Sequence, residues 1–147
     1  MGRVDVDLRA VFRDLVRFET ELWNRVDARL ATEHGLPLSW LEIMEVIATT
    51  PGCRVLDVAD ALRITVGGAS KVVDKLQAAG WVRRRPNPDD GRSSLLGLTR
   101  TGERLRRAAD VTNGAELADR LGSAAPAVDL ARLAADLRRL RAQLRER

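Results

Sequence analysis

The feature that most limits how this 147-residue chain can fold is the pattern of apolar residues between Val55 and Thr99. Residues 55–62 place their apolar side chains on one face of a short helix, and the next three residues interrupt that pattern. Thr65 is a suitable N-cap for a second helix over residues 66–79, which carries its own apolar stripe at 66, 69, 72, 73 and 76. Gly80 fits the position that follows the C-cap of that helix.

Two alternating segments, residues 82–85 and 93–98, follow the second helix. Between them lies Pro-Asn-Pro-Asp-Asp-Gly-Arg, a composition typical of a turn. Helix, short turn, helix and hairpin in this order predict a winged helix-turn-helix. The usual ligand of that module is double-stranded DNA.

Helical segments are also predicted on both sides of this module. Apolar residues from Val4 to Leu30 recur at spacings of three and four, which predicts one long helix that ends before Gly35. A helix ending near Thr49 should begin with a capping box formed by Ser39 and Glu42. The fold class is therefore mostly α with a small β-hairpin wing.

Two helices are predicted after the hairpin. Thr99 can cap a helix that reaches about Leu121, in which Asn113-Gly114 predicts a bend or a weak point. The last helix should begin at Pro126 and carries leucines at 130, 133, 137, 140 and 144. That narrow leucine seam either packs on the N-terminal helix of the same chain or meets a second chain.

Charge and composition narrow the classes of function. Residues 1–50 hold 6 Arg and 9 acidic residues, a net charge of −3, whereas residues 51–104 hold 10 Lys or Arg and 6 acidic residues, a net charge of +4. A basic excess on a helix-turn-helix favours nucleic acid as the partner. There is no run of about 18 apolar residues and no signal-peptide pattern, so we expect a cytoplasmic protein without membrane association.

Catalytic and metal chemistry find little support in the sequence. The single Cys53 excludes a disulfide within the chain, and His34 is the only histidine. No Ser-His-Asp set, phosphate-binding glycine loop or metal-ligand spacing is present, so we predict no enzyme, no catalytic residue, no metal and no cofactor. Cys53 is interpreted as an inert small residue.

The motifs of the hairpin resemble those of the MarR family of bacterial transcription regulators. Asp90-Gly91-Arg92, five further residues and Leu98-Thr99 match the wing signature of that family, and Gly102 completes its Leu-Thr-x-x-Gly sequence. The resemblance extends from about Leu15 to the C-terminus and is sharpest over residues 58–102. It implies a homodimer that binds a near-palindromic operator, more often as a repressor, and that an effector releases.

The predicted DNA-contacting residues lie on the recognition helix and the wing. They are Thr65, Val66, Gly67, Gly68, Ser70, Lys71, Lys75, Arg84, Asp90 and Arg92. Arg92 should reach the minor groove from the wing tip, while Asp90 holds it or shapes the turn. Two alternatives stay open: the two lysines are a solvated helix face, and Asp90 with Arg92 is only a local ion pair.

The resemblance also implies how the chain is divided. Residues 1–147 would form a single domain, with 1–33 and 102–147 as dimerisation helices and 38–100 as the DNA-binding core. A pocket for a small-molecule effector would be lined by Phe18, Leu22, Trp23, Trp40 and Met44. The alternative is a winged-helix module for protein interaction or small-molecule binding without DNA binding, which the unusual Gly67-Gly68 pair supports.

Overall fold

The computed structural model describes residues 5–146 and shows a mostly helical chain with one antiparallel hairpin. This confirms the predicted fold class. The elements are α1 (Leu8–His34), α2 (Leu38–Thr49), α3 (Val55–Leu62), α4 (Val66–Ala78), β1 (Val82–Pro86), β2 (Ser94–Leu98), α5 (Arg100–Leu121), the short 3-10 helix η1 (Gly122–Ala124) and α6 (Leu130–Arg145). Val4, the first residue of the predicted N-terminal seam, lies outside the described residues.

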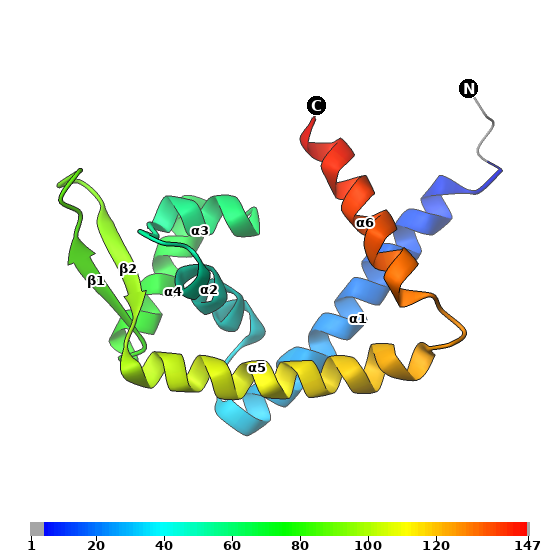
Figure 1. Ribbon diagram of the computed structural model, residues 1–147, viewed down its shortest axis with the longest axis horizontal. Helices are drawn as coiled ribbons and strands as arrows, with labels where there is room; N and C mark the ends of the chain where they lie inside the picture. The colour runs from blue at the N-terminus through cyan, green and yellow to red at the C-terminus, as the bar shows by residue number, and fades with distance from the viewer. Residues whose placement is uncertain (1–4, 147) are drawn as a thin grey trace.

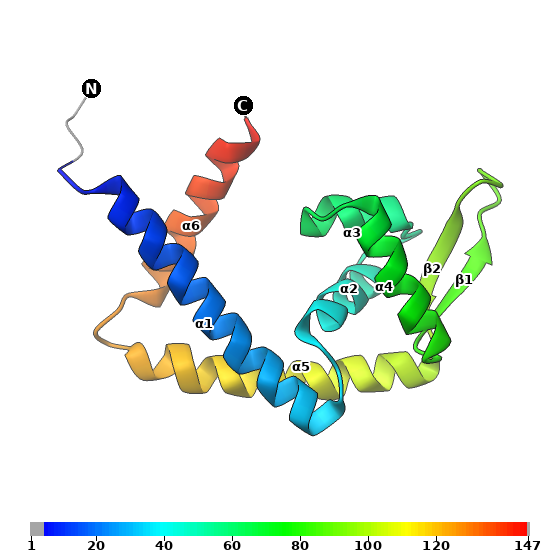
Figure 2. The ribbon, with the colours of Figure 1, turned by 180° about the vertical axis from the view of Figure 1, so that it is seen from behind.

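Helix α5 forms a long base on which the other elements stand (Figure 1). The hairpin and helices α2, α3 and α4 lie over its N-terminal half, α1 crosses it near its middle, and α6 rises from its C-terminal end. The view from behind shows the same separation (Figure 2). The winged module and the two terminal helices are thus joined chiefly through α5 and the C-terminal end of α1.

One apolar core holds the winged module together. Its fully buried side chains come from the end of α1, from α2, α3, α4 and the hairpin, and include Leu30, Leu36, Leu41, Met44, Val58, Val73 and Leu76. Burial of apolar surface of this kind is the main stabilising contribution in a domain of this size. Val66, which the sequence pattern assigned to the buried stripe of α4, is instead 50% exposed because it lies in the first turn, beyond the core.

Two helices end at the glycines that the sequence predicted. Gly35 has a φ of +61° after α1, and Gly80 has a φ of +80° after α4. The amide of Gly80 donates to the carbonyl of Gln77, and the amide of Trp81 donates to the carbonyl of Leu76, which is the hydrogen-bond pattern of a Schellman motif.

Three predictions about helix ends and continuity were wrong. The capping box of Ser39 and Glu42 is not formed: the N-cap of α2 is Pro37, two residues earlier, and Asp27 of α1 accepts a 2.7 Å hydrogen bond from the amide of Leu38. Helix α5 continues through Asn113-Gly114, because side-chain contacts with α1 on both sides of the pair hold it in place. Helix α6 begins at Leu130 rather than Pro126, because Asp129 is its N-cap and accepts from the amide of Arg132.

The terminal helices leave much apolar surface uncovered within one chain. Phe12 of α1 is 66% exposed, Leu140 of α6 is 53% exposed and Leu144 is 82% exposed. No residue of α6 is buried. Packing on the N-terminal helix of the same chain therefore does not account for the leucine seam. Among the described residues, no helix combines the length and the apolarity that crossing a membrane requires.

Candidate nucleic-acid interface

The N-terminal end of α4 presents a small, open surface. Thr65 is the N-cap as predicted, and its Oγ1 accepts a 3.0 Å hydrogen bond from the amide of Gly68. Gly67 has open space where a Cβ would stand, whereas a Cβ on Gly68 would meet Oγ1 of Thr65 at 3.0 Å. Glycine at these two positions therefore lets another molecule approach the backbone of the first helical turn closely.

The remaining predicted residues of α4 fall on its outer surface. Lys71 and Lys75 are exposed, and Ser70 is partly buried beside them. The two lysines lie one turn apart, on the same side of the helix. The structure therefore places the predicted residues of α4 together on an accessible surface.

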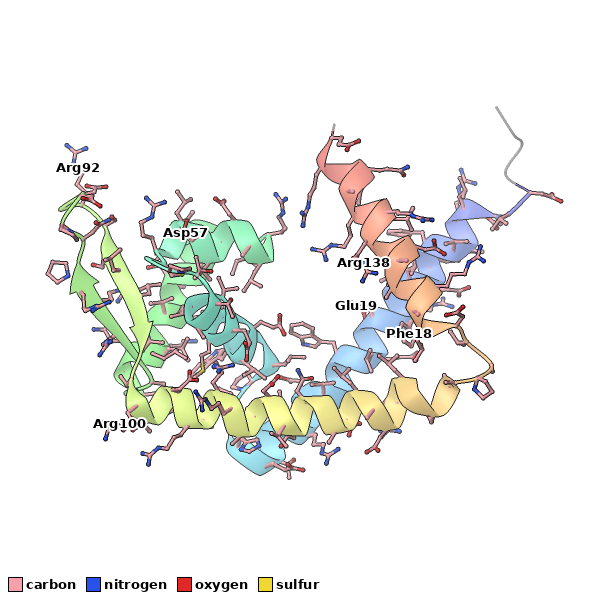
Figure 3. The ribbon with its side chains drawn as sticks, in the orientation of Figure 1. Phe18, Glu19, Asp57, Arg92, Arg100 and Arg138 are labelled. Atoms are coloured by element: carbon pink, nitrogen blue, oxygen red, sulfur yellow. The ribbon has the colours of Figure 1, made fainter. Side chains whose placement is uncertain are left out.

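The tip of the hairpin is shaped by side-chain acceptors. Oδ1 of Asp90 accepts a 3.0 Å hydrogen bond from the backbone amide of Arg92, and Oδ1 of Asn87 accepts from the amide of Asp89. Among the described residues, Asp90 and Arg92 form no ion pair. Asp90 therefore shapes the turn, and the side chain of Arg92 projects from the tip (Figure 3).

Arg84 connects the wing to α4. Its Nη1 lies 2.7 Å from Oδ1 of Asp74 and donates a 2.7 Å hydrogen bond to Oε1 of Gln77. Its neighbours in the strand, Arg83 and Arg85, are exposed. Arg84 thus has a positioning role within the chain, in addition to its predicted part in binding.

Sequence reasoning missed Arg54, which lies across from the wing. A concave surface of about 390 Å³ is lined by Arg54, Val55, Leu56, Arg84, Asp90, Arg92, Ser93 and Ser94. The amide of Arg54 donates to Asp57 at 2.8 Å, and its guanidinium pairs with the same carboxylate at 3.2 Å. This pairing lowers the pKa of Asp57. The sequence did contain one signal for this pair, since Asp57 follows Arg54 by three positions at the start of a helix.

A close joint fixes the recognition helix and hairpin on α5. Oγ1 of Thr99 donates to the carbonyl of Gly80 at 2.6 Å and accepts from the amide of Gly102 at 3.0 Å. A Cβ on Gly102 would collide with the carbonyl group of Trp81. Trp81 in turn packs edge-on against Trp40, with ring centroids 6.1 Å apart. The end of α4 and the base of the wing are therefore fixed directly to the start of α5.

Ion pairs join the same part of α5 to α2. Nη1 of Arg106 lies 2.8 Å from Glu45, and Nη2 of Arg106 lies 2.8 Å from Glu103. Hydrogen bonds from Arg106 and Arg107 lower the pKa of Glu103 to about 2. The carboxylate of Glu103 is therefore ionised over the whole neutral and mildly acidic range.

A separate cleft of about 500 Å³ lies between α1, α2, α5 and α6. Phe18, Leu22 and Trp23, three of the five residues named for the pocket, line it. Figure 3 marks Phe18 on the stretch of α1 that stands above α5. Trp40 and Met44 do not line this cleft, which corrects the prediction: Met44 is fully buried in the core, and Trp40 packs on Trp81.

The two other residues that could carry chemistry, Cys53 and His34, are respectively buried and within hydrogen-bond distance of another side chain. Cys53 is fully buried, and burial raises the pKa of its thiol to about 11, with a smaller contribution from the charge of Asp57. Nε2 of His34 lies 2.8 Å from Oγ1 of Thr112. Among the described residues, no group of three or more His, Cys, Asp or Glu side chains is arranged to hold a metal ion.

The fold and the exposed surface define a winged helix-turn-helix protein. Residues 34–93 match the model described as the MarR family. It is 35% identical over 72 residues to the HTH-type transcriptional regulator BilQ of Clostridium symbiosum, a match that covers 49% of this chain and 50% of that protein. It is 29% identical over 83 residues to the multiple antibiotic resistance protein MarR of Escherichia coli, covering 54% of this chain and 58% of that protein. The matches thus span only about half the length of these curated relatives.

Solved structures show the same fold over nearly the whole chain. The MarR family transcriptional regulator AbsC from Streptomyces coelicolor superposes with a TM-score of 0.83 at 23% identity, covering 99% of this chain and all of that one. FabT of Streptococcus pneumoniae, in a complex with DNA, superposes with a TM-score of 0.77 at 18% identity, covering 95% and 99% of the two chains. These similarities show that the arrangement of α1, α5 and α6 around the winged module is the fold of these two solved regulators.

Proposed function

We propose that this protein is a sequence-specific DNA-binding transcription regulator that acts as a homodimer. The observation that carries the proposal is the accessible start of α4 together with a wing tipped by the exposed Arg92, which shares a concave surface with Arg54 at the start of α3. The names of the relatives, which include a transcriptional regulator and a FabT–DNA complex, support the same function.

The proposed division of labour follows from the side chains available. Helix α4 enters the major groove with Thr65, Val66, Gly67, Gly68, Ser70, Lys71 and Lys75 toward the DNA. Glycines carry no side chain for base recognition, so Ser70 and Lys71 contribute the polar contacts and the glycine backbone approaches a phosphate. Arg92 enters the minor groove, where the negative potential favours a guanidinium. Arg84 and Asp90 hold the wing in the shape that this requires.

Dimerisation is proposed through the terminal helices. In this division, residues 38–100 form the DNA-binding core and residues 1–33 and 102–147 form the dimer interface of a single domain. The exposed leucines of α6 and the exposed Phe12, Leu15 and Val16 of α1 are the surfaces that a second copy would cover. A two-fold axis then presents two wings and two recognition helices to a near-palindromic operator.

The cleft between α1, α2, α5 and α6 is the proposed effector site of a cytoplasmic repressor. A ligand there touches α1, α2 and α5 together, and α5 is fixed to the recognition helix through Thr99 and Gly102. A ligand that prefers one position of α5 would therefore change the spacing of the two recognition helices and release the operator.

The test is salt-dependent binding of the full chain to the DNA upstream of its own gene, measured by fluorescence anisotropy beside a scrambled duplex. We expect tighter binding to the natural sequence, and a slope against salt concentration that reflects several phosphate contacts. The glycine pair in α4 favours one competing function, a winged-helix module for protein interaction. Equal, weak binding to both duplexes at every salt concentration would favour that function and contradict ours.

A further inference from the structure

The cleft between α1, α2, α5 and α6 has a distinctive chemical character. Its volume of about 500 Å³ falls within the range of roughly 300–1,000 Å³ typical of small-molecule sites. Most of its wall is apolar and comes from Leu15, Phe18, Leu22, Trp23, Val26, Leu38, Leu117 and Leu137. The polar lining residues are Glu19, Glu42 and Asn113. Within the described chain, the wall of the cleft therefore carries two acidic groups and no basic group.

Glu42 is the more enclosed of the two carboxyl groups. It lies in the first half of α2 and is partly buried, but it forms no ion pair and accepts no hydrogen bond among residues 5–146. Glu45, one turn further along α2, is by contrast bound to Arg106 at 2.8 Å. The chain thus supplies a cation to Glu45 and leaves Glu42 facing the cleft.

The surroundings of Glu42 disfavour the ionised form of its carboxyl group. Burial raises the pKa of Glu42, and the negative charge of Glu45 raises it further. A partly desolvated carboxylate without a partner gains more from a nearby cation than an exposed one does. The cleft therefore holds an acceptor whose ionised form a positively charged ligand would stabilise.

The aromatic residues of the wall suit the same kind of ligand. Trp23 and Phe18 line the cleft beside Glu19, which follows Phe18 on α1 (Figure 3). The faces of aromatic rings attract cations, and tryptophan does so most strongly. The apolar wall would hold the body of such a ligand, while Glu42 and Glu19 would face its positive charge.

We propose that this cleft selects hydrophobic cations, such as aromatic amines or onium ions, and disfavours hydrophobic anions of the same shape. The inference rests on the proposed function, in which this cleft is the effector site. A hydrophobic anion would meet two carboxylates in a partly dry site, which charge repulsion makes unfavourable. A terminal helix of a second copy could instead fill the cleft, and the experiment below distinguishes that case.

The test uses two ions of nearly identical shape and opposite charge, tetraphenylphosphonium and tetraphenylborate. Each is titrated into the full chain by calorimetry at about 0.15 M salt, where long-range attraction is largely screened. We expect the phosphonium to bind at least about tenfold more tightly, which corresponds to about 1.4 kcal/mol. Glu42→Gln should weaken its binding at least about fivefold, and the double change with Glu19→Gln should remove the preference for the cation.

Glu21→Gln is the matched control, because Glu21 is exposed on α1 and does not line the cleft. It should leave the binding of both ions unchanged. Equal affinity for the two ions, an unchanged preference in the double variant, or no binding of either ion would overturn the proposal. The last result is also the one expected if a second copy fills the cleft.

The DNA titration and the ion titration test separate proposals, and either proposal can be contradicted without the other. If the chain prefers the phosphonium but binds its natural DNA no more tightly than a scrambled duplex, the cation site is supported and the regulator function is contradicted. If the chain binds its DNA specifically but shows no preference between the two ions, the regulator function is supported and the cation site is contradicted.

Discussion

Nη1 of Arg106 lies 2.8 Å from Oε1 of Glu45, and this contact joins the first half of α5 to α2. The same guanidinium also pairs with Glu103 within α5, which holds Arg106 in position for its contact with α2. The side chain of Arg106 is 17% exposed, the lowest value among the arginines that form ion pairs within residues 5–146. The position of the winged module on α5 therefore depends on charge as well as on apolar packing.

The first prediction concerns how stability depends on pH through Glu103. Its folded-state pKa is about 2, below the ordinary value of 4.5, so its contribution is fully present above about pH 5 and is lost as pH falls toward 2. Glu103→Gln should therefore lower the free energy of unfolding at pH 7, and this deficit should shrink steadily on acidification. Urea unfolding of both proteins between pH 7 and pH 3 measures the effect. A deficit that stays constant with pH would show that the ion pairs contribute nothing through this carboxylate.

The second prediction compares two glycines within α5. A Cβ on Gly102 would collide with the carbonyl group of Trp81, whereas Gly114 has nothing within 4 Å of the corresponding position. Gly102→Ala should destabilise the protein by about 1–3 kcal/mol because the backbone of the joint must move. Gly114→Ala should stabilise it by about 0.5–1 kcal/mol, since alanine is the better helix former. Thermal unfolding that shows the same change for both variants would contradict the close joint.

These two glycines illustrate how far sequence reasoning reached. Turn and capping signals are local, so Thr65, Gly80 and Thr99 could be assigned from the residues beside them, and they were confirmed. Gly114 looked like a break because a propensity scale does not include the tertiary contacts that keep α5 continuous. The helix start at Leu38 could not be predicted either, because its capping acceptor, Asp27, comes from another helix.

In the candidate site, too, some features could be predicted from the local sequence and others depend on tertiary packing. Motif spacing pointed to the residues of α4 and of the wing tip, whereas the partners of Arg84 on α4 and the position of Arg54 depend on how separate elements pack. Trp40 and Met44 have the composition of pocket residues and lie outside the cleft. An amphipathic pattern shows which side of a helix is apolar, but it does not distinguish a core from a cavity.

The third prediction concerns Cys53. The thiol is fully buried and its pKa is about 11, so very little thiolate is present at neutral pH. Hydrogen peroxide should leave this thiol unmodified in the folded protein, and Cys53→Ser should leave DNA affinity and its response to peroxide unchanged. Mass spectrometry after peroxide treatment, with and without urea, separates protection by folding from low intrinsic reactivity. Rapid oxidation of the folded protein would make Cys53 a redox sensor.

The fourth prediction concerns α6. Its leucine seam is uncovered within one chain, with Leu144 82% exposed, and a second copy is the proposed cover. A chain that ends at residue 125 should be monomeric or aggregated and should bind DNA poorly. Sedimentation equilibrium measures the assembly state, and circular dichroism checks that the winged module still folds. A truncated protein that remains a tight dimer would place the interface elsewhere.

The central claim is that the wing and the recognition helix bind DNA together. Arg92 projects from the hairpin tip, and its side chain forms no ion pair among the described residues (Figure 3). Its replacement should therefore cost binding energy without loosening the fold. Lys75 lies a turn further from the start of α4 than Lys71 and should contribute less. Arg85, exposed on β1 and outside the turn at the tip, supplies an arginine control.

The most direct measurement is a salt titration of Arg92→Ala, Lys75→Ala and Arg85→Ala on the natural upstream DNA and on a scrambled duplex. Arg92→Ala should weaken specific binding at least about tenfold, or about 1.4 kcal/mol, while Lys75→Ala should cost less and Arg85→Ala least. A lost phosphate contact should also reduce the salt slope by about one. If Arg92→Ala binds the natural DNA as tightly as the unchanged protein at every salt concentration, the wing is only a structural hairpin and this account is contradicted.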